Sequence, residues 1–292
     1  MISNLEEIYC LIDNLTSLID KEFKTTKVGR KKKLSRSELI TIAIIKQKLG
    51  LSTNKQLYFL IKKYMRNDFS KLPSYQQFCA GLESNFLYLG LINSVLLHVN
   101  KQKGSEFFVI DSTPLPLCSV GYRFRSKLGK GLAGSGKNMN GWHYGFKLHL
   151  IINKNMDIVS FKFTNGSISD IAALDKIMVK GISGYLIGDK GYLSFKKSKE
   201  LLKSNITLIT KNRKNMKKTP VTKKILNMLR RRQIVETSFS VLKDRLQIIN
   251  KKARSIKSFF SQALAAILTY TIDNDRRLLR LESDELIIKA IS

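Results

Sequence analysis

The chain has 292 residues, of which 43% are hydrophobic, so it is long enough for one large domain or two ordinary domains with a buried core. Its 52 Lys and Arg against 22 Asp and Glu give a formal net charge of +30. AT-rich coding, which favours Lys, Ile and Asn, is an alternative explanation of this charge, but it has a minor role because no matching excess of Glu balances the Lys. Such a surface favours a polyanionic partner, above all nucleic acid.

Cysteine usage and the apolar stretches indicate the compartment. The three cysteines are too few and too widely spaced for a disulfide framework or a zinc site, which fits a reducing cytoplasm. The first residues lack the apolar core of a signal peptide. The two longest apolar stretches are too short and too polar to span a bilayer, so we expect no membrane association and predict buried helices at Phe86–Val99 and Phe259–Ile272.

The first hundred residues have a helical pattern. Ser35 and Glu38 form a capping-box sequence before an apolar run, and further helices are expected at about Thr53–Tyr64, after Pro73–Ser74, and at Phe86–Val99. Short helices that follow the basic run Gly29–Lys33 resemble a small DNA-binding unit such as a helix-turn-helix. A helical packing domain with a solvated basic face explains the same pattern, and both interpretations remain open.

The pattern changes near Lys101–Ser105, so we expect a helical region over residues 1–100 and an α/β domain with a mixed sheet over residues 101–280. A strand that ends at Asp111 is followed by an irregular segment from Ser112 to Asn140. The expected strands are Phe107–Asp111, Tyr144–Ile152, Ile158–Phe163, Gly184–Asp189 and Ile206–Thr210. The turn Asn153–Asp157 makes a hairpin of the second and third strands. The expected helices are Asp170–Val179, Ser194–Lys203, Val221–Leu246 and Ser258–Ile272.

Three acidic residues are candidates for chemistry. Asp111 and Asp189 each end an apolar strand, and Glu236 lies on the long predicted helix. Carboxylates at strand ends and on a helix can converge, hold Mg²⁺ and leave room for phosphate oxygens. The alternative is that each Asp is an ordinary turn residue and that Glu236 forms a salt bridge on a solvated face.

Cations near Glu236 suggest phosphate binding. Helical geometry places Arg232 and Lys243 on the same side as Glu236, and Arg230 and Arg231 add to the positive charge. His143, beside Trp142 and Tyr144, is a weaker candidate for contact with a base or a phosphate, because a single His is more often structural. Asp170 is interpreted as structural, since an acidic residue at a helix start interacts favourably with the helix dipole.

Several of these segments together resemble the DDE transposases of bacterial insertion sequences, and most closely the insertion sequence 982 family. The resemblance covers residues 107–273 and rests on five segments: Val109–Pro116, Tyr144–His149, Gly166–Asp170, Gly188–Tyr192 and Arg231–Ser240. The family triad then corresponds to Asp111, Asp189 and Glu236. Related families carry a Tyr, Arg, Glu, Lys signature that Arg232, Glu236 and Lys243 match, whereas Leu229 stands at the Tyr position.

The resemblance implies an RNase H-like catalytic core with two Mg²⁺ or Mn²⁺ ions held by the triad. It also implies binding to double-stranded DNA, at the terminal inverted repeats of the element and at the target, by a homo-oligomer in the bacterial cytoplasm near the nucleoid. The expected activity is strand cleavage and strand transfer at the ends of an insertion sequence. Two alternatives remain: a metal-dependent nuclease that joins no strands, and a non-catalytic DNA-binding regulator derived from a transposase.

Overall fold

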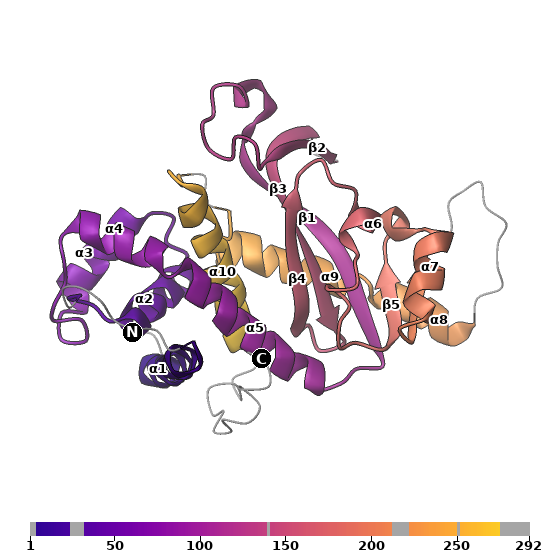
Figure 1. Ribbon diagram of the computed structural model, residues 1–292, viewed down its shortest axis with the longest axis horizontal. Coiled ribbons are helices and arrows are strands. Elements are labelled where there is room, and N and C mark those ends of the chain that lie inside the picture. Colours follow the sequence, from indigo (N-terminus) through magenta and orange to yellow (C-terminus); the bar gives the residue numbers. More distant parts are fainter. Residues whose placement is uncertain (1–3, 24–31, 139–140, 212–221, 250–251, 275–292) are drawn as a thin grey trace. The chain divides into compact units, whose positions relative to one another are not determined.

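The computed structural model describes residues 4–23, 32–138, 141–211, 222–249 and 252–274 (Figure 1). The chain forms two compact units. One combines the residues up to Val99 with those from Val241 onward, and the other extends from Asn100 to Ser240. The division after Val99 lies beside the boundary expected near residue 100. At the other end, the domain expected over residues 101–280 extends past Ser240, where the chain re-enters the helical unit.

The helical unit is built around a buried C-terminal helix. Its described elements are α1 (Leu5–Glu22), α2 (Arg36–Lys48), α3 (Asn54–Tyr64), α4 (Tyr75–Ser84), most of α5 (Phe86–Gln102), the π-helical turn η3 (Val241–Arg245) and α10 (Ile256–Asn274). The predicted capping box is confirmed: Ser35 Oγ accepts a hydrogen bond from the Glu38 N–H at 3.1 Å. α10 is buried almost throughout and packs against α2 and α4, which explains why the residues after Val241 join this unit.

A second group of apolar residues fills the space between the shorter helices of this unit. It consists of Leu34, Leu39, Ile42, Ile45, Leu57, Ile61, Phe69 and Phe78. Within the described residues no single helix has the length and apolar composition to cross a membrane. α4 and α5 meet those two criteria only as a pair, which is bent by 42°.

The other unit is an α/β domain with a mixed sheet, as predicted. Its strands are β1 (Phe107–Ser119), β2 (Gly134–Asn138), β3 (Gly141–Asn153), β4 (Ile158–Asn165), β5 (Gly184–Gly188) and β6 (Ile206–Thr210). The strand order is β2-β3-β1-β5-β6, and β4 also pairs with β3. β3 is antiparallel to β1 and β4, whereas β5 and β6 are parallel to β1. The path β4-β3-β1-β5-β6, in which only β3 runs antiparallel to its neighbours, is the strand order of an RNase H-like fold.

β1 is longer than the sequence pattern predicts. It does not end at Asp111 but continues to Ser119, paired with β3, while its pairing with β5 stops at Val109. Pro114 and Pro116 are tolerated here because one side of β1 has no partner strand at these positions, so no ladder hydrogen bond is lost. The segment expected to be irregular therefore contains the second half of β1 and all of β2.

Gly145 allows β3 to pass close to this part of β1. A Cβ atom at Gly145 would lie 2.4 Å from the Leu115 carbonyl oxygen and 2.8 Å from the Leu117 nitrogen. The pairing register shifts between Pro116 and Cys118, directly opposite this close approach. Any side chain at position 145 would push the two strands apart.

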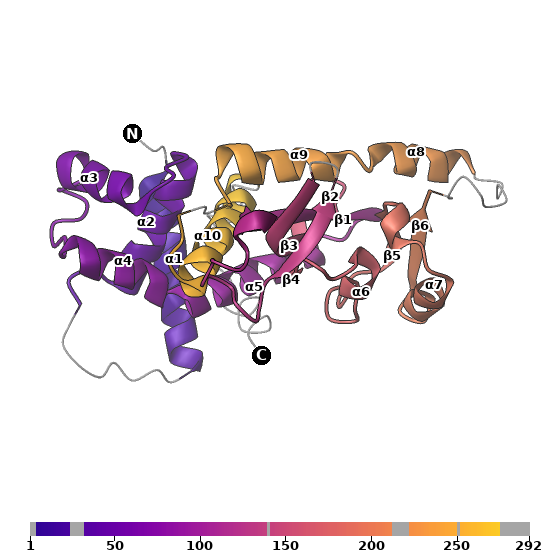
Figure 2. The ribbon, with the colours of Figure 1, turned by 90° about the horizontal axis from the view of Figure 1, so that it is seen from above.

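Four short helices cover the sheet, with α8 (Lys223–Arg231) and α9 (Ile234–Ser240) on one side and α6 (Asp170–Ala173) and α7 (Phe195–Leu202) on the other (Figure 2). The 3₁₀ turns η1 (Val120–Tyr122) and η2 (Lys190–Tyr192) complete the unit. The long helix expected over Val221–Leu246 is not continuous, because α8 and α9 are separate and a π-helical turn follows α9. The helix expected to reach Val179 ends at Ala173.

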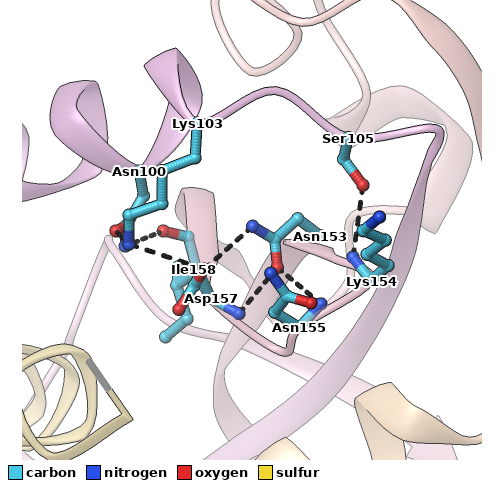
Figure 3. Close-up of polar contacts among 8 residues, drawn as sticks. All are labelled: Asn100, Lys103, Ser105, Asn153, Lys154, Asn155, Asp157 and Ile158. Atoms are coloured by element: carbon cyan, nitrogen blue, oxygen red, sulfur yellow. Dashed lines mark hydrogen bonds and ion pairs between the residues drawn. The ribbon is translucent and has the colours of Figure 1, made fainter.

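The turn between β3 and β4 lies where the hairpin prediction placed it and is closed by side-chain hydrogen bonds (Figure 3). Asn153 Oδ1 accepts from the N–H groups of Asn155 and Asp157, both at 2.9 Å, and Asn153 Nδ2 donates to Asp157 Oδ2. Lys103, just after α5, pairs with Asp157 at 3.5 Å. Asn100 donates to the Ile158 carbonyl oxygen at 2.9 Å. These contacts fix the start of this unit to the hairpin.

Candidate active site

Asp111 and Asp189 lie side by side at one edge of the paired strands. β1 and β5 are parallel, and Val109 pairs with Ile187. Asp111 and Asp189 each follow that pair by two residues, so they lie on neighbouring segments of the chain at the point where β5 ends and β1 continues. Neighbouring strands are about 4.8 Å apart, so the two carboxylates lie near each other where β5 ends and the pairing of β1 with β5 stops.

Asp111 is the less exposed member of this pair, since its side chain is 20% exposed whereas Asp189 is an exposed residue. The pKa of Asp111 is raised from 3.8 to about 6, mainly by burial and to a smaller extent by the nearby carboxylates of Asp189 and Asp170. The Ser112 N–H, which donates to Asp111 Oδ1 at 2.8 Å, and the Arg232 guanidinium oppose this rise. At Asp111, burial and the two neighbouring carboxylates therefore outweigh the stabilisation of the ionised form by the Ser112 N–H and Arg232.

Arg232 connects Asp111 to Glu236. Its Nη1 lies 3.3 Å from Asp111 Oδ2 and its Nη2 lies 3.0 Å from Glu236 Oε1. Arg232 is the C-cap residue directly after α8, and Glu236 is in the first turn of α9. The guanidinium is 18% exposed, whereas the Glu236 side chain is 56% exposed. One arginine thus links two of the three predicted acidic residues.

Asp170 belongs to the same cluster, although its position at a helix start suggested a structural role. Its Oδ1 accepts a hydrogen bond from Ser112 Oγ at 2.7 Å and lies 3.3 Å from Lys147 Nζ. Lys147 also donates to the Ile168 carbonyl oxygen at 2.9 Å. The buried Tyr192 lies beneath the cluster, and its pKa is raised by burial and then by Asp170 and Asp111. In the sequence, the segment Gly166–Asp170 contributes to the family resemblance, and this was the feature that could have indicated that Asp170 lies at the cluster.

The structure shows no contact of the remaining candidates with these carboxylates among the described residues. Arg230 and Arg231 are exposed in the last turn of α8. Lys243 belongs to the helical unit and lies in the π-helical turn η3, so the assumption of regular helical spacing from Glu236 does not hold. His143 is 8% exposed, and neither of its ring nitrogens has a hydrogen-bond partner among the described residues. Burial, followed by Lys147, lowers the pKa of His143.

The donor atoms of this cluster fit a hard divalent cation. Among the described residues, no three His, Cys, Asp or Glu side chains lie close enough to one another to hold a metal ion. The guanidinium of Arg232 supplies the positive charge between Asp111 and Glu236. Carboxylate oxygens are the ligands of Mg²⁺ and Mn²⁺, and a cation here would favour the ionised form of Asp111 against the burial and the neighbouring carboxylates that raise its pKa. The composition of the cluster therefore suits such an ion.

An RNase H-like sheet with acidic side chains where the parallel pairing of two adjacent strands stops places the protein in a class that includes nucleic-acid-processing enzymes. The family comparison is more specific. Residues 101–256 match the family model described as a transposase DDE domain, which covers more than half of the chain. The chain therefore belongs to the transposase DDE domain family.

No curated protein shows significant sequence similarity to the chain. Among solved structures, a piggyBac transposase in a synaptic complex with hairpin DNA, determined by cryo-EM, matches with a TM-score of 0.47 and 11% sequence identity. The match covers 100% of this chain and 78% of that chain.

Proposed function

We propose that the chain is a bacterial transposase of the insertion sequence 982 type, which cleaves and joins DNA strands at the ends of its element. The observation that carries the proposal is the adjacency of Asp111 and Asp189 in a chain of the transposase DDE domain family. Arg232, which contacts both Asp111 and Glu236, supports Glu236 as the third member of the triad.

In this proposal Asp111, Asp189 and Glu236 hold two Mg²⁺ or Mn²⁺ ions. When bound, such ions activate the attacking water or 3′-hydroxyl and stabilise the leaving oxygen of the phosphodiester. The protein holds the carboxylates in place: Ser112 N–H and Arg232 bind Asp111. Asp170 fixes the Ser112 side chain and the nearby Lys147.

Cationic side chains bind the DNA backbone in the same proposal. Arg232 is the candidate that reaches the acidic cluster itself, so it orients a phosphate there, and its planar guanidinium suits bidentate contact. Arg230, Arg231 and Lys243 add phosphate contacts, whereas the buried His143 is a poorer candidate for this role. The affinity for DNA is therefore expected to fall steeply with salt.

The proposed partners are the terminal inverted repeats and target DNA, bound in the bacterial cytoplasm by a homo-oligomer. We assign recognition of the repeats to the helices before residue 100 and catalysis to the sheet unit. The basic run before α2 lies partly outside the described residues, and its role in DNA binding stays a prediction.

The decisive experiment supplies the purified full chain with paired ends of the element that flanks its gene, target DNA and Mg²⁺. Joined product is the expected result. Cleavage without joining would replace the proposal with a metal-dependent nuclease, and binding without cleavage would replace it with a DNA-binding regulator. Asp189→Asn is the matched control, because it must remove the product in the first two cases and leave binding in all three.

A further inference from the structure

A long stretch of the sheet unit carries positive charge without any acidic residue. Between Asp111 and Asp157 the chain contains no Asp or Glu, and its cations are Arg123, Arg125, Lys127, Lys130, Lys137, Lys147 and Lys154. Most of these cations lie on the segment between β1 and β2, which extends beyond the ends of the strands in Figure 1. The catalytic cluster described above uses none of the five cations from Arg123 to Lys137.

The same segment exposes large apolar side chains. Tyr122 is 61% exposed, Phe124 86%, Leu132 58% and Trp142, at the start of β3, 61%. None of the four is part of the core of this unit. Aromatic rings that are left in water among cations are typical of a surface with a binding partner rather than of a folding core.

The rings and the cations share one face of the β2–β3 ribbon. Lys137 is paired with Trp142 and Ser135 with Tyr144 across the two strands, and directly paired residues project to the same side. Lys137 Nζ lies 5.9 Å from the centre of the Trp142 ring. Arg123 donates to Ser135 Oγ at 3.4 Å, and its guanidinium carbon lies 4.5 Å from the Phe124 ring.

Hydrogen bonds anchor this segment to the sheet. The Tyr144 hydroxyl donates to the Gly129 carbonyl oxygen at 3.3 Å. Asn165 Nδ2, at the end of β4, donates to the Leu132 carbonyl oxygen at 3.0 Å. The exposed rings are therefore presented on a supported surface, which lowers the entropy lost on binding.

We propose that this surface, formed by Arg123, Phe124, Lys137, Trp142 and Tyr144, binds unpaired single-stranded DNA. Bases stack on Phe124 and Trp142, and the cations hold the phosphates, which is the combination used by single-strand binding sites. Trp142 and Tyr144 lie at alternate positions of β3, so their rings are about 7 Å apart, whereas bases in duplex DNA are about 3.4 Å apart. An unstacked, extended strand matches that spacing and a duplex does not.

Trp142 makes the proposal directly measurable, because it is the single tryptophan of the chain. The full-length protein is titrated with an oligothymidylate of about 12 nucleotides while tryptophan fluorescence is recorded. We expect strong quenching by this oligonucleotide and little by an abasic oligonucleotide of equal length or by a duplex. Equal quenching by the abasic strand would show that the surface binds phosphates without stacking bases. Equal quenching by the duplex would show that it does not prefer unpaired DNA, and either result would contradict the proposal.

Variants separate stacking from charge. Trp142→Ala should weaken oligothymidylate binding, measured by anisotropy of a labelled strand, about tenfold, or about 1.4 kcal/mol, without changing the salt slope. Trp142→Phe should keep most of the affinity. Lys137→Ala should lower the salt slope by about 0.7. The matched control is Phe195→Ala on α7, a residue that is 78% exposed and has Lys199 at 4.6 Å from its ring.

Equal losses in Trp142→Ala and Phe195→Ala would overturn the proposal, since binding would then follow general exposure of aromatic residues. Circular dichroism shows whether each variant is folded, and a Trp142→Ala variant that unfolds is replaced by Phe124→Ala, for which the same loss is expected. The inference does not depend on the catalytic proposal. An Asp189→Asn protein should bind oligothymidylate like the wild type, so failure of catalysis and failure of this surface are distinguished.

Discussion

Replacing Arg232 with Ala tests the electrostatic organisation of the acidic cluster. Arg232 contacts Asp111 at 3.3 Å and Glu236 at 3.0 Å, and its side chain is 18% exposed. An ordinary pair of charges four residues apart on a helix contributes at most about 0.5 kcal/mol. If Arg232 also neutralises a buried Asp111, its removal must cost more, and the cost must depend on the ionisation of Asp111.

The magnitude follows from the pKa of Asp111. A pKa of about 6 instead of 3.8 corresponds to about 3 kcal/mol against the ionised form. Because the pKa is raised in the folded state, ionisation of Asp111 destabilises the fold progressively between pH 3.8 and about 6, and the full cost is present above that window. Arg232 is one of two groups that oppose this rise, so Arg232→Ala increases the cost of the ionised form.

The assay is the free energy of unfolding from denaturant titration, without metal, at about pH 5 and about pH 8. We expect Arg232→Ala to lower it by about 1–2 kcal/mol at the higher pH and by less than about 0.5 kcal/mol at the lower pH, where Asp111 is mostly protonated. Arg232→Lys should recover only part of the loss, because one ammonium group replaces two nitrogens that reach different carboxylates.

The matched control is Arg245→Ala. Arg245 pairs with Asp273 at 3.4 Å, but its side chain is 62% exposed, so we expect a loss of at most about 0.5 kcal/mol at both pH values. If Arg232→Ala costs no more than this control and shows no dependence on pH, Arg232 forms only a solvated salt bridge. The argument that it neutralises the buried carboxylate would then be wrong.

Four further predictions follow. Each change of a triad carboxylate to its amide should abolish strand cleavage while DNA binding persists, since cations bind the phosphates; a variant that still cleaves removes its position from Asp111, Asp189 and Glu236. Asp170→Ala should slow single-turnover cleavage, and Asp170→Asn, which can still accept from Ser112, should recover part of the rate. Residues 100–240 alone should give a cooperative thermal transition, whereas a 101–292 fragment should aggregate, because it exposes α10 without α2 and α4. The pKa of the buried His149 is lowered to about 4 by burial. About 3 kcal/mol of stability that is present above pH 6.5 is therefore lost as the pH falls toward 4. His149→Gln should remove this loss, which is opposite in sign to the effect of Asp111.

The short strands of the sheet were predictable because the sequence features that mark a short strand lie within it or directly beside it. β6 has the predicted bounds, and β5 ends one residue before the predicted end, since short apolar runs flanked by turn residues mark both. The hairpin of β3 and β4 followed from the turn Asn153–Asp157. The second half of β1 was not predictable from local pattern, because Pro114 and Pro116 argue against a strand and only pairing with β3, distant in sequence, keeps them in one.

The roles of the candidate site residues stay predictions, but part of their placement followed from the sequence. The apolar runs before Asp111 and Asp189 predicted that these residues lie near each other, and the parallel pairing of Val109 with Ile187 places them so, although β1 continues past Asp111. Asp170 was assigned a structural role because a helix-start acid has a sufficient local explanation, and its contact with Ser112 depends on the fold. No Gly or Pro between Arg230 and Leu246 marks the break in the long predicted helix. Lys243 was therefore placed relative to Glu236 by assuming a regular helix, and the structure does not have one there.

The break between α8 and α9 is favourable electrostatically. Arg232 is the C-cap residue directly after α8 and Glu236 lies in the first turn of α9, so a cation is at a helix C-terminus and an anion at a helix N-terminus, both favourable with the helix dipoles. The N–H groups of Val235 and Glu236 bond to carbonyl oxygens three residues earlier, at 3.3 and 3.0 Å. This tightened turn stays attached to the sheet because Val235 and Phe239 are buried and α9 packs against β1. β1 also carries Asp111, so the break holds Arg232 where its guanidinium reaches both carboxylates.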